Sequence, residues 1–95
     1  MLTYKAVDQF IDGGLHAYIL DFPGAITCAA DLGEARRLLA SALVDLAEMS
    51  LERGEPLPTP DPSLSDPDAD IEEPLYLQLR ASTAVERTPA GVVAP

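Results

Sequence analysis

Several residues that commonly mark the function of a small protein are scarce in this chain. Its 95 residues include a single cysteine, Cys28, so no disulfide can form within the chain. Its stability therefore does not depend on an oxidising compartment. No stretch approaches the roughly 18–20 continuous apolar residues of a transmembrane helix. The first residues also lack the charged-then-apolar layout of a signal peptide, and we expect a cytoplasmic protein without a membrane segment.

Basic residues are also few. The chain has 6 Lys and Arg residues against 16 Asp and Glu residues, which gives a formal net charge of −10. Nucleic-acid binding draws much of its affinity from Lys and Arg side chains that neutralise phosphates, so direct binding of DNA or RNA by this chain is disfavoured. A basic protein partner is favoured, because opposite charge speeds encounter and selects partners. The alternative is that the acidic residues only keep the protein soluble.

Side chains that ligate metals or act as nucleophiles are equally rare. His16 and Cys28 are the only residues of their kinds, which is too few for a structural zinc site, and we expect Cys28 to be a small buried residue. A metal-dependent nuclease needs several carboxylates that converge on two metal ions. Asp8, Asp21 and Glu34 are the early candidates, and Glu34 is better explained as part of a helix cap. We therefore expect no enzyme, no catalytic residue, no metal site and no cofactor.

Apolar residues make up 47% of the chain, and they follow clear periodic patterns. Residues 2–11 and 15–22 alternate as two strands, joined by the glycine-rich turn Asp12-Gly13-Gly14. The alternation blurs after Val7, which could mark a β-bulge. A short third strand is predicted at residues 25–29.

The strongest pattern predicts a helix over residues 32–53. Apolar residues recur at helical spacing through this segment, with charged residues on the opposite side. Asp31 can cap the first turn, and Glu34 lies three residues later, which resembles a capping box. Gly54 and the prolines after it are typical of a helix end.

The rest of the chain contains a long connector and a final strand. Residues 55–74 are rich in Pro, Asp and Ser, and they predict an acidic connector. It is either a solvated loop or a segment that docks on a basic partner or a neighbouring subunit. Residues 75–80 predict a fourth strand, which can return parallel to the first through a right-handed crossover. Residues 82–95 are expected to form a flexible tail, which leaves a single domain at residues 1–81.

The element order β-β-β-α-β predicts an α+β fold. One mostly antiparallel sheet packs on one long helix, as a two-layer sandwich. A four-stranded sheet with one helix leaves a sheet face uncovered, and this face is expected to carry Tyr18, Leu20, Phe22 and Tyr76. An exposed apolar face of this kind is usually buried in an interface. We therefore expect a homodimer or a homotetramer.

The order of these elements and the residues at their joints resemble the HicB family of toxin–antitoxin systems. The matching motifs are Asp12-Gly13-Gly14, Phe22-Pro23-Gly24, Asp31-Leu32-Gly33-Glu34-Ala35 and Gly54-Glu55-Pro56-Leu57-Pro58. Residues 22–35 align with the family pattern without a gap. The resemblance covers about residues 2–60 and the last strand.

This resemblance implies a truncated, RNase H-like fold without nuclease activity. The usual role of the family is to bind and neutralise a small basic toxin that cleaves messenger RNA. Many members carry a C-terminal DNA-binding module, but the 15 residues after Arg80 are too few for one. The resemblance therefore favours an antitoxin that acts by protein–protein contact. The alternative is a stand-alone homo-oligomeric scaffold of the same fold, without a toxin.

Two groups of residues are the candidates for a partner or oligomer interface. The apolar group is the one expected on the uncovered sheet face. The acidic group lies at the end of the connector and the start of the last strand, and it consists of Asp66, Asp68, Asp70, Glu72 and Glu73.

Overall fold

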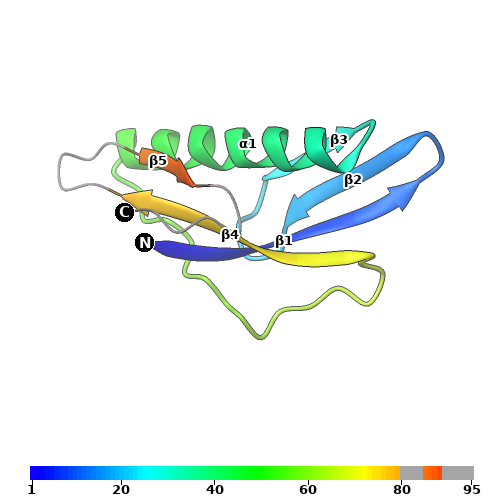
Figure 1. Ribbon diagram of the computed structural model, residues 1–95. Helices are drawn as coiled ribbons and strands as arrows, with labels where there is room; N and C mark the ends of the chain where they lie inside the picture. Colours follow the sequence, from blue (N-terminus) through cyan, green and yellow to red (C-terminus); the bar gives the residue numbers. More distant parts are fainter. Residues whose placement is uncertain (80–84, 89–95) are drawn as a thin grey trace.

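The computed structural model describes residues 1–79 and 85–88 of the chain (Figure 1). Its elements are β1 (Leu2–Ile11), β2 (Gly14–Ile19), β3 (Ile26–Ala29), α1 (Leu32–Glu52), β4 (Ile71–Leu79) and β5 (Val85–Thr88). One sheet and one helix form two packed layers. This arrangement confirms the predicted α+β sandwich.

The strands form one sheet in the order β3-β2-β1-β4-β5, and every neighbouring pair is antiparallel. The parallel return of the strand after the helix is therefore wrong. Helix α1 ends at the end of the sheet where β1 begins, and the connector carries the chain back to the opposite end before β4 starts (Figure 1). A shorter connector would have started β4 beside the first residues of β1. β5 lies within the predicted tail 82–95, and the rest of that segment is outside the described residues.

β1 is buried on both faces at its centre. Ala6, Val7 and Asp8 are 4%, 0% and 2% exposed, although consecutive residues of a strand point to opposite faces. The register of β1 is continuous with β2 and with β4. The blurred alternation after Val7 therefore reflects cover on both faces, and the predicted bulge is wrong.

The start and the end of α1 follow the sequence closely. The carboxylate of Asp31 accepts a hydrogen bond from the backbone nitrogen of Glu34 at 2.8 Å. Glu34 in turn accepts one from the backbone nitrogen of Ala30 at 3.4 Å, as in a capping box. Gly54 adopts a φ of 69° after the last turn, a conformation that favours glycine. The buried face of the helix consists of Ala35, Leu39, Ala40, Leu43 and Ala47.

β4 begins earlier than expected and contains Pro74. This proline is the register partner of Lys5, whose backbone carbonyl oxygen accepts a hydrogen bond from the backbone nitrogen of Leu20 at 3.0 Å and whose N–H donates to Asp21, so neither group faces β4. No N–H is therefore required from Pro74 on that side, and β5 pairs only with residues 76–79 of β4. A proline is tolerated at such an unpaired position.

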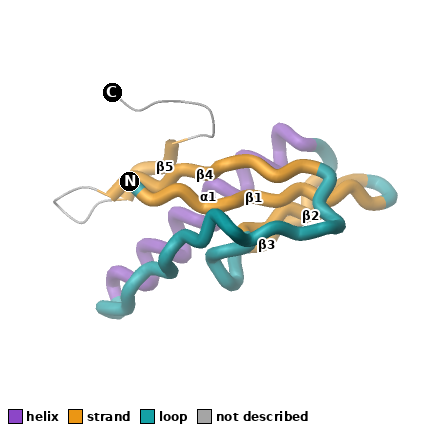
Figure 2. Tube along the Cα trace, turned by 90° about the horizontal axis from the view of Figure 1, so that it is seen from below, coloured by secondary structure: helices purple, strands orange, loops and turns teal. Residues whose placement is uncertain are grey.

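The connector lies on the face of the sheet opposite α1 (Figure 2). It leaves the helix at one end of the sheet, passes beneath the strands and joins β4 at the other end. We call residues 55–70 the strap. We expected the sheet face opposite the helix to be uncovered. This is wrong for the part of that face that the strap covers.

Candidate functional site

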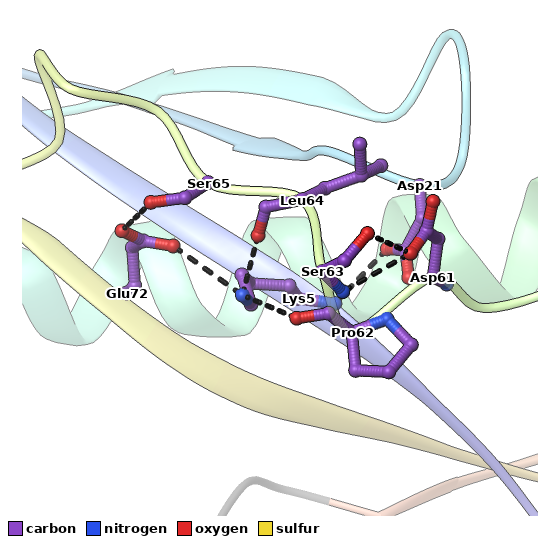
Figure 3. Close-up of polar contacts among 8 residues, drawn as sticks. All are labelled: Lys5, Asp21, Asp61, Pro62, Ser63, Leu64, Ser65 and Glu72. Carbon is purple, nitrogen blue, oxygen red and sulfur yellow. Dashed lines mark hydrogen bonds and ion pairs between the residues drawn. The ribbon is translucent and has the colours of Figure 1, made fainter.

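The strap is fastened to the sheet first through Asp21. This carboxylate is only 7% exposed. Its Oδ1 accepts a hydrogen bond from the backbone nitrogen of Lys5 at 3.0 Å, and its Oδ2 accepts one from that of Asp61 at 2.9 Å. Asp61 then closes a local turn by accepting from the backbone nitrogen of Ser63 (Figure 3). One buried side chain thus joins β1, the segment after β2 and the strap.

The ammonium group of Lys5 holds the middle of the strap. Its Nζ donates to the carbonyl oxygen of Pro62 at 3.1 Å and to that of Leu64 (Figure 3). It also lies 3.6 Å from Oε1 of Glu72, at the start of β4. The other carboxylate oxygen of Glu72 accepts from the hydroxyl of Ser65 at 2.8 Å. The charge of Lys5 is therefore used within the fold.

Two tyrosines, Tyr4 of β1 and Tyr18 of β2, also hold the strap. The hydroxyl of Tyr4 donates to the carbonyl oxygen of Pro58 at 2.7 Å, and the hydroxyl of Tyr18 donates to the carboxylate of Asp66. Burial, and secondarily the Asp21 carboxylate, raises the pKa of Tyr4 to about 12. The hydrogen bond to Asp66 raises the pKa of Tyr18 to about 12, and the same bond lowers the pKa of Asp66.

The last residue of the strap is held by main-chain groups of β1. The backbone nitrogen of Asp70 donates to the carbonyl oxygen of Asp8 at 2.9 Å. The carboxylate of Asp70 accepts from the backbone nitrogen of Phe10 at 2.6 Å. These bonds extend the edge of β1 beyond its pairing with β4, so the strap is anchored along its length from Pro58 to Asp70.

A groove of about 540 Å³ remains between the strap and the first half of β4. Thr3 and Lys5 of β1 form its floor, with Pro62 and Ser65 on one side and Glu72 and Pro74 on the other. Three polar side chains that line the groove already bind one another, because Glu72 accepts a hydrogen bond from Ser65 and forms an ion pair with Lys5.

Negative charge dominates the strap and the strand that follows it. Residues 55–79 contain seven carboxylates and no Lys or Arg. The carboxylates are those of Glu55, Asp61, Asp66, Asp68, Asp70, Glu72 and Glu73. Asp68, Asp70 and Glu72 are exposed, and the ammonium group of Lys5 is shared between strap carbonyl groups and Glu72. This face therefore presents carboxylates without a matching set of cations.

The structure brings together only some of the predicted interface residues. Tyr18 and Asp66 are in direct contact, and Asp70 and Glu72 belong to the same strap network. Asp68 is exposed beside them, and its backbone nitrogen donates to Asp66.

The remaining predicted interface residues lie elsewhere. Leu20 and Tyr76 are half-buried. Phe22 is 4% exposed and packs edge-on against Tyr4 with ring centroids 5.2 Å apart, so its placement on a surface is wrong. The chain leaves β2 after Ile19, and the turn that follows directs Phe22 into the core. Glu73 forms a two-point ion pair with Arg36 of α1, at 2.9 and 3.0 Å, and lies on the helix side of the sheet.

Sequence reasoning missed two residues that hold the strap, Asp21 and Lys5. Asp21 precedes a Pro-Gly turn and looks like an ordinary turn residue, and Lys5 alternates as a solvent-facing strand residue. Their partners are 40 and 57–59 residues away in the chain. The prediction that Cys28 is buried is also wrong. Its side chain is exposed, because β3 lies at the edge of the sheet.

Asp8 is a buried carboxylate outside the strap network. It is 2% exposed, and its Oδ2 has no hydrogen-bond partner. Burial raises the pKa of Asp8, and Glu73 adds to this effect, while Arg36 opposes it. The Arg36–Glu73 pair thus lies next to an isolated acid in the helix–sheet interface.

Within residues 1–79 and 85–88, no group of three or more His, Cys, Asp and Glu side chains is arranged to hold a metal ion. No helix in the described part of the chain is long and apolar enough to span a membrane. No family model matches the chain, and no curated protein matches it.

Proposed function

We propose that this chain is a HicB-like antitoxin that binds a small basic, mRNA-cleaving toxin through its strap face and covers the toxin's RNA-binding surface. The proposal rests on one observation above all. The strap is an ordered acidic surface, and Lys5, the cation that contacts it in the described part of the chain, is engaged with strap carbonyl groups and Glu72. The resemblance of the turn and cap motifs to the HicB family supports the same reading.

Electrostatics makes a basic partner the best match for this surface. A toxin that binds RNA must present Lys and Arg side chains to phosphates. The exposed carboxylates Asp68, Asp70 and Glu72 attract the same side chains. Occlusion then requires no catalysis by this chain, because the toxin's basic surface cannot hold RNA and the strap at once.

The anchoring of the strap favours tight binding. A disordered acidic segment would lose conformational entropy when it bound a partner. Here Asp21, Lys5 and Tyr18 already hold the strap in one conformation. The surface is therefore preorganised, and less of the interaction energy is spent on ordering it.

Co-expression with the adjacent reading frame tests the proposal. We expect a tagged copy of this chain to recover a basic protein of roughly 60–80 residues, the size that the family resemblance implies, and to prevent it from cleaving RNA. Absence of such a frame, or recovery of no basic protein from the native host, would count against neutralisation and in favour of the stand-alone scaffold.

A matched pair of charge reversals locates the surface. Asp68→Lys places a cation on the strap, and Glu48→Lys makes the same change on the exposed side of α1. We expect the strap variant to weaken toxin binding about tenfold or more and the helix variant to bind almost as the native chain does. Equal effects of the two variants would show that only net charge matters and would contradict a strap interface.

A further inference from the structure

β3 is an outer strand of the sheet in the described part of the chain, and its free side has a defined set of backbone groups. The backbone nitrogen of Ile19 donates to the carbonyl oxygen of Ala25 at 3.0 Å, in step with the β2–β3 register. Antiparallel strands direct alternate residues to the same neighbour. Thr27 therefore pairs its backbone with β2, and the N–H and C=O groups of Ile26 and Cys28 point away from the sheet.

This edge lacks the usual protection against strand pairing. Native edge strands commonly carry a charge, a proline or a bulge that prevents another strand from adding. β3 reads Ile-Thr-Cys-Ala, and it lies within residues 22–30, the longest uncharged run of the sequence. Ile26 is 61% exposed, and Cys28 is exposed on the same face.

Because the chain is strongly acidic, the position of the uncharged residues 22–30 indicates where two copies can meet. Two copies of a chain with a formal charge of −10 repel each other over most of their surfaces. An uncharged edge is where they can approach at the least electrostatic cost. A strand from a basic partner would gain no such advantage there, since β3 offers it no carboxylate.

We propose that two copies of the chain pair through β3 in an antiparallel, two-fold symmetric manner, with Thr27 at the symmetry axis. This register places Ile26 opposite Cys28 of the second copy. It satisfies both outward N–H groups and both outward C=O groups of each β3, because the outward residues 26 and 28 then form hydrogen-bonded pairs. The two sheets become one continuous sheet, and Ile26 packs beside Cys28 of the second copy.

This pairing is independent of the proposed function, since it leaves the strap free in both copies. The strap contacts β1, β4 and Tyr18 of β2, and the anchors described above include no residue of β3. A dimer formed this way could present two strap faces to two partners.

A disulfide tests the register directly. Ile26→Cys in the native background places a cysteine opposite Cys28 of the second copy. The expected Cα separation is about 5.5 Å, within the range that a disulfide spans. We expect oxidation of this variant to give a covalent dimer on a non-reducing gel. The matched control, Ile26→Cys with Cys28→Ser, leaves one cysteine in each copy. The proposed register separates these two cysteines by two residues along the strands, a Cα separation of about 8 Å that a disulfide does not span, so we expect no covalent dimer. Cross-linking of the control instead would overturn the register.

Sedimentation of the full chain tests the pairing itself. We expect a concentration-dependent dimer that Ile26→Lys weakens about tenfold or more, because each interface then contains two lysine charges in place of two apolar side chains on the edge strand. Glu48→Lys, on the exposed side of α1, should leave dimerisation unchanged. Circular dichroism checks that both variants fold, and Cys28→Lys provides a second edge variant. A monomer at high micromolar concentration would overturn the proposal. The proposal would also be overturned if the chain were a monomer and Ile26→Lys abolished its binding of a basic partner. The β3 edge would then pair with a strand of that partner.

Discussion

Asp21 and Asp61 are 40 residues apart in the sequence, yet Oδ2 of Asp21 accepts a hydrogen bond from the backbone nitrogen of Asp61 at 2.9 Å. The other oxygen of the same carboxylate binds the backbone of Lys5 at 3.0 Å. A buried carboxylate that accepts two backbone N–H bonds is a strong local constraint. It determines where the strap begins to cross the sheet, and therefore where the acidic face is presented.

We predict that Asp21→Asn loosens the strap and destabilises the fold. The amide keeps one acceptor but turns an NH₂ group toward a backbone N–H, which leaves two donors facing each other. We expect a loss of about 1–3 kcal/mol in the free energy of unfolding, measured by urea denaturation. The strap should also become more sensitive to a protease that cleaves at acidic residues.

Asp45→Asn, at an exposed position on α1, is the matched control for this change. It removes the same charge without touching the strap, and we expect a change within about 0.5 kcal/mol. Equal stability of the two variants would show that Asp21 does not anchor the strap.

The tyrosines give a second prediction, at alkaline pH. Tyr4 and Tyr18 have pKa values of about 12 in the folded chain, above the ordinary value of 10. Groups with a raised folded-state pKa stabilise the fold fully below their unfolded-state pKa. This stabilisation is lost as the pH rises from about 10 through about 12. We expect a spectrophotometric titration to show two phenols ionising near pH 12, together with loss of stability over the same range.

Single substitutions assign these ionisations. Tyr18→Phe should remove one high-pH phenol and raise the pKa of Asp66, although the backbone N–H of Asp68 still lowers it. Tyr4→Phe should remove the other phenol and leave Asp66 unaffected. Ionisation of all the tyrosines at about pH 10 in the native chain would contradict the hydrogen bonds that fasten the strap.

The local parts of this structure could be predicted from the sequence, because neighbouring residues determine them. The glycine turn, the inward face Leu15, Ala17 and Ile19, and the cap formed by Asp31 and Glu34 all depend on spacings of a few residues. The antiparallel register of β4 could not be predicted in the same way. It depends on a connector that is long enough to return the chain to the far end of the sheet.

The strap itself was beyond sequence reasoning for the same physical reason. Pro, Asp and Ser residues are typical of solvated loops, and the anchors that order this loop lie 40–59 residues away. The burial of β1 on both faces at Ala6, Val7 and Asp8 explains the blurred alternation, which in the sequence resembles a bulge. The sequence pattern of β2, continued to residue 22, predicts that Phe22 lies on the outer sheet face. The strand ends at Ile19, so the pattern does not apply to Phe22.

Asp8 gives a prediction for the helix–sheet interface. Its raised pKa means that ionisation of Asp8 opposes folding, so this group makes the fold less stable as the pH rises above about 4. Asp8→Asn keeps the size of the side chain and removes the buried charge. We expect a higher midpoint of urea denaturation at pH 7 than in the native chain, and a smaller difference at pH 4. A lower midpoint at pH 7 would show that the attraction between Asp8 and Arg36 outweighs the cost of burial.

The two glycines of the first hairpin should respond differently to alanine, because only one of them lies against another strand. A Cβ on Gly14 would lie 2.3 Å from the carbonyl oxygen of Ala29, so β3 would have to move away from β2. Gly13 has open space around it, and its φ of 81° causes only backbone strain. We expect Gly14→Ala to cost about 2 kcal/mol or more in the free energy of unfolding and Gly13→Ala about 1 kcal/mol. Gly14→Ala should also weaken dimerisation, because it displaces the edge through which we propose that two copies pair. If Gly14→Ala left both stability and dimerisation unchanged, the close approach of β3 to the hairpin would be wrong.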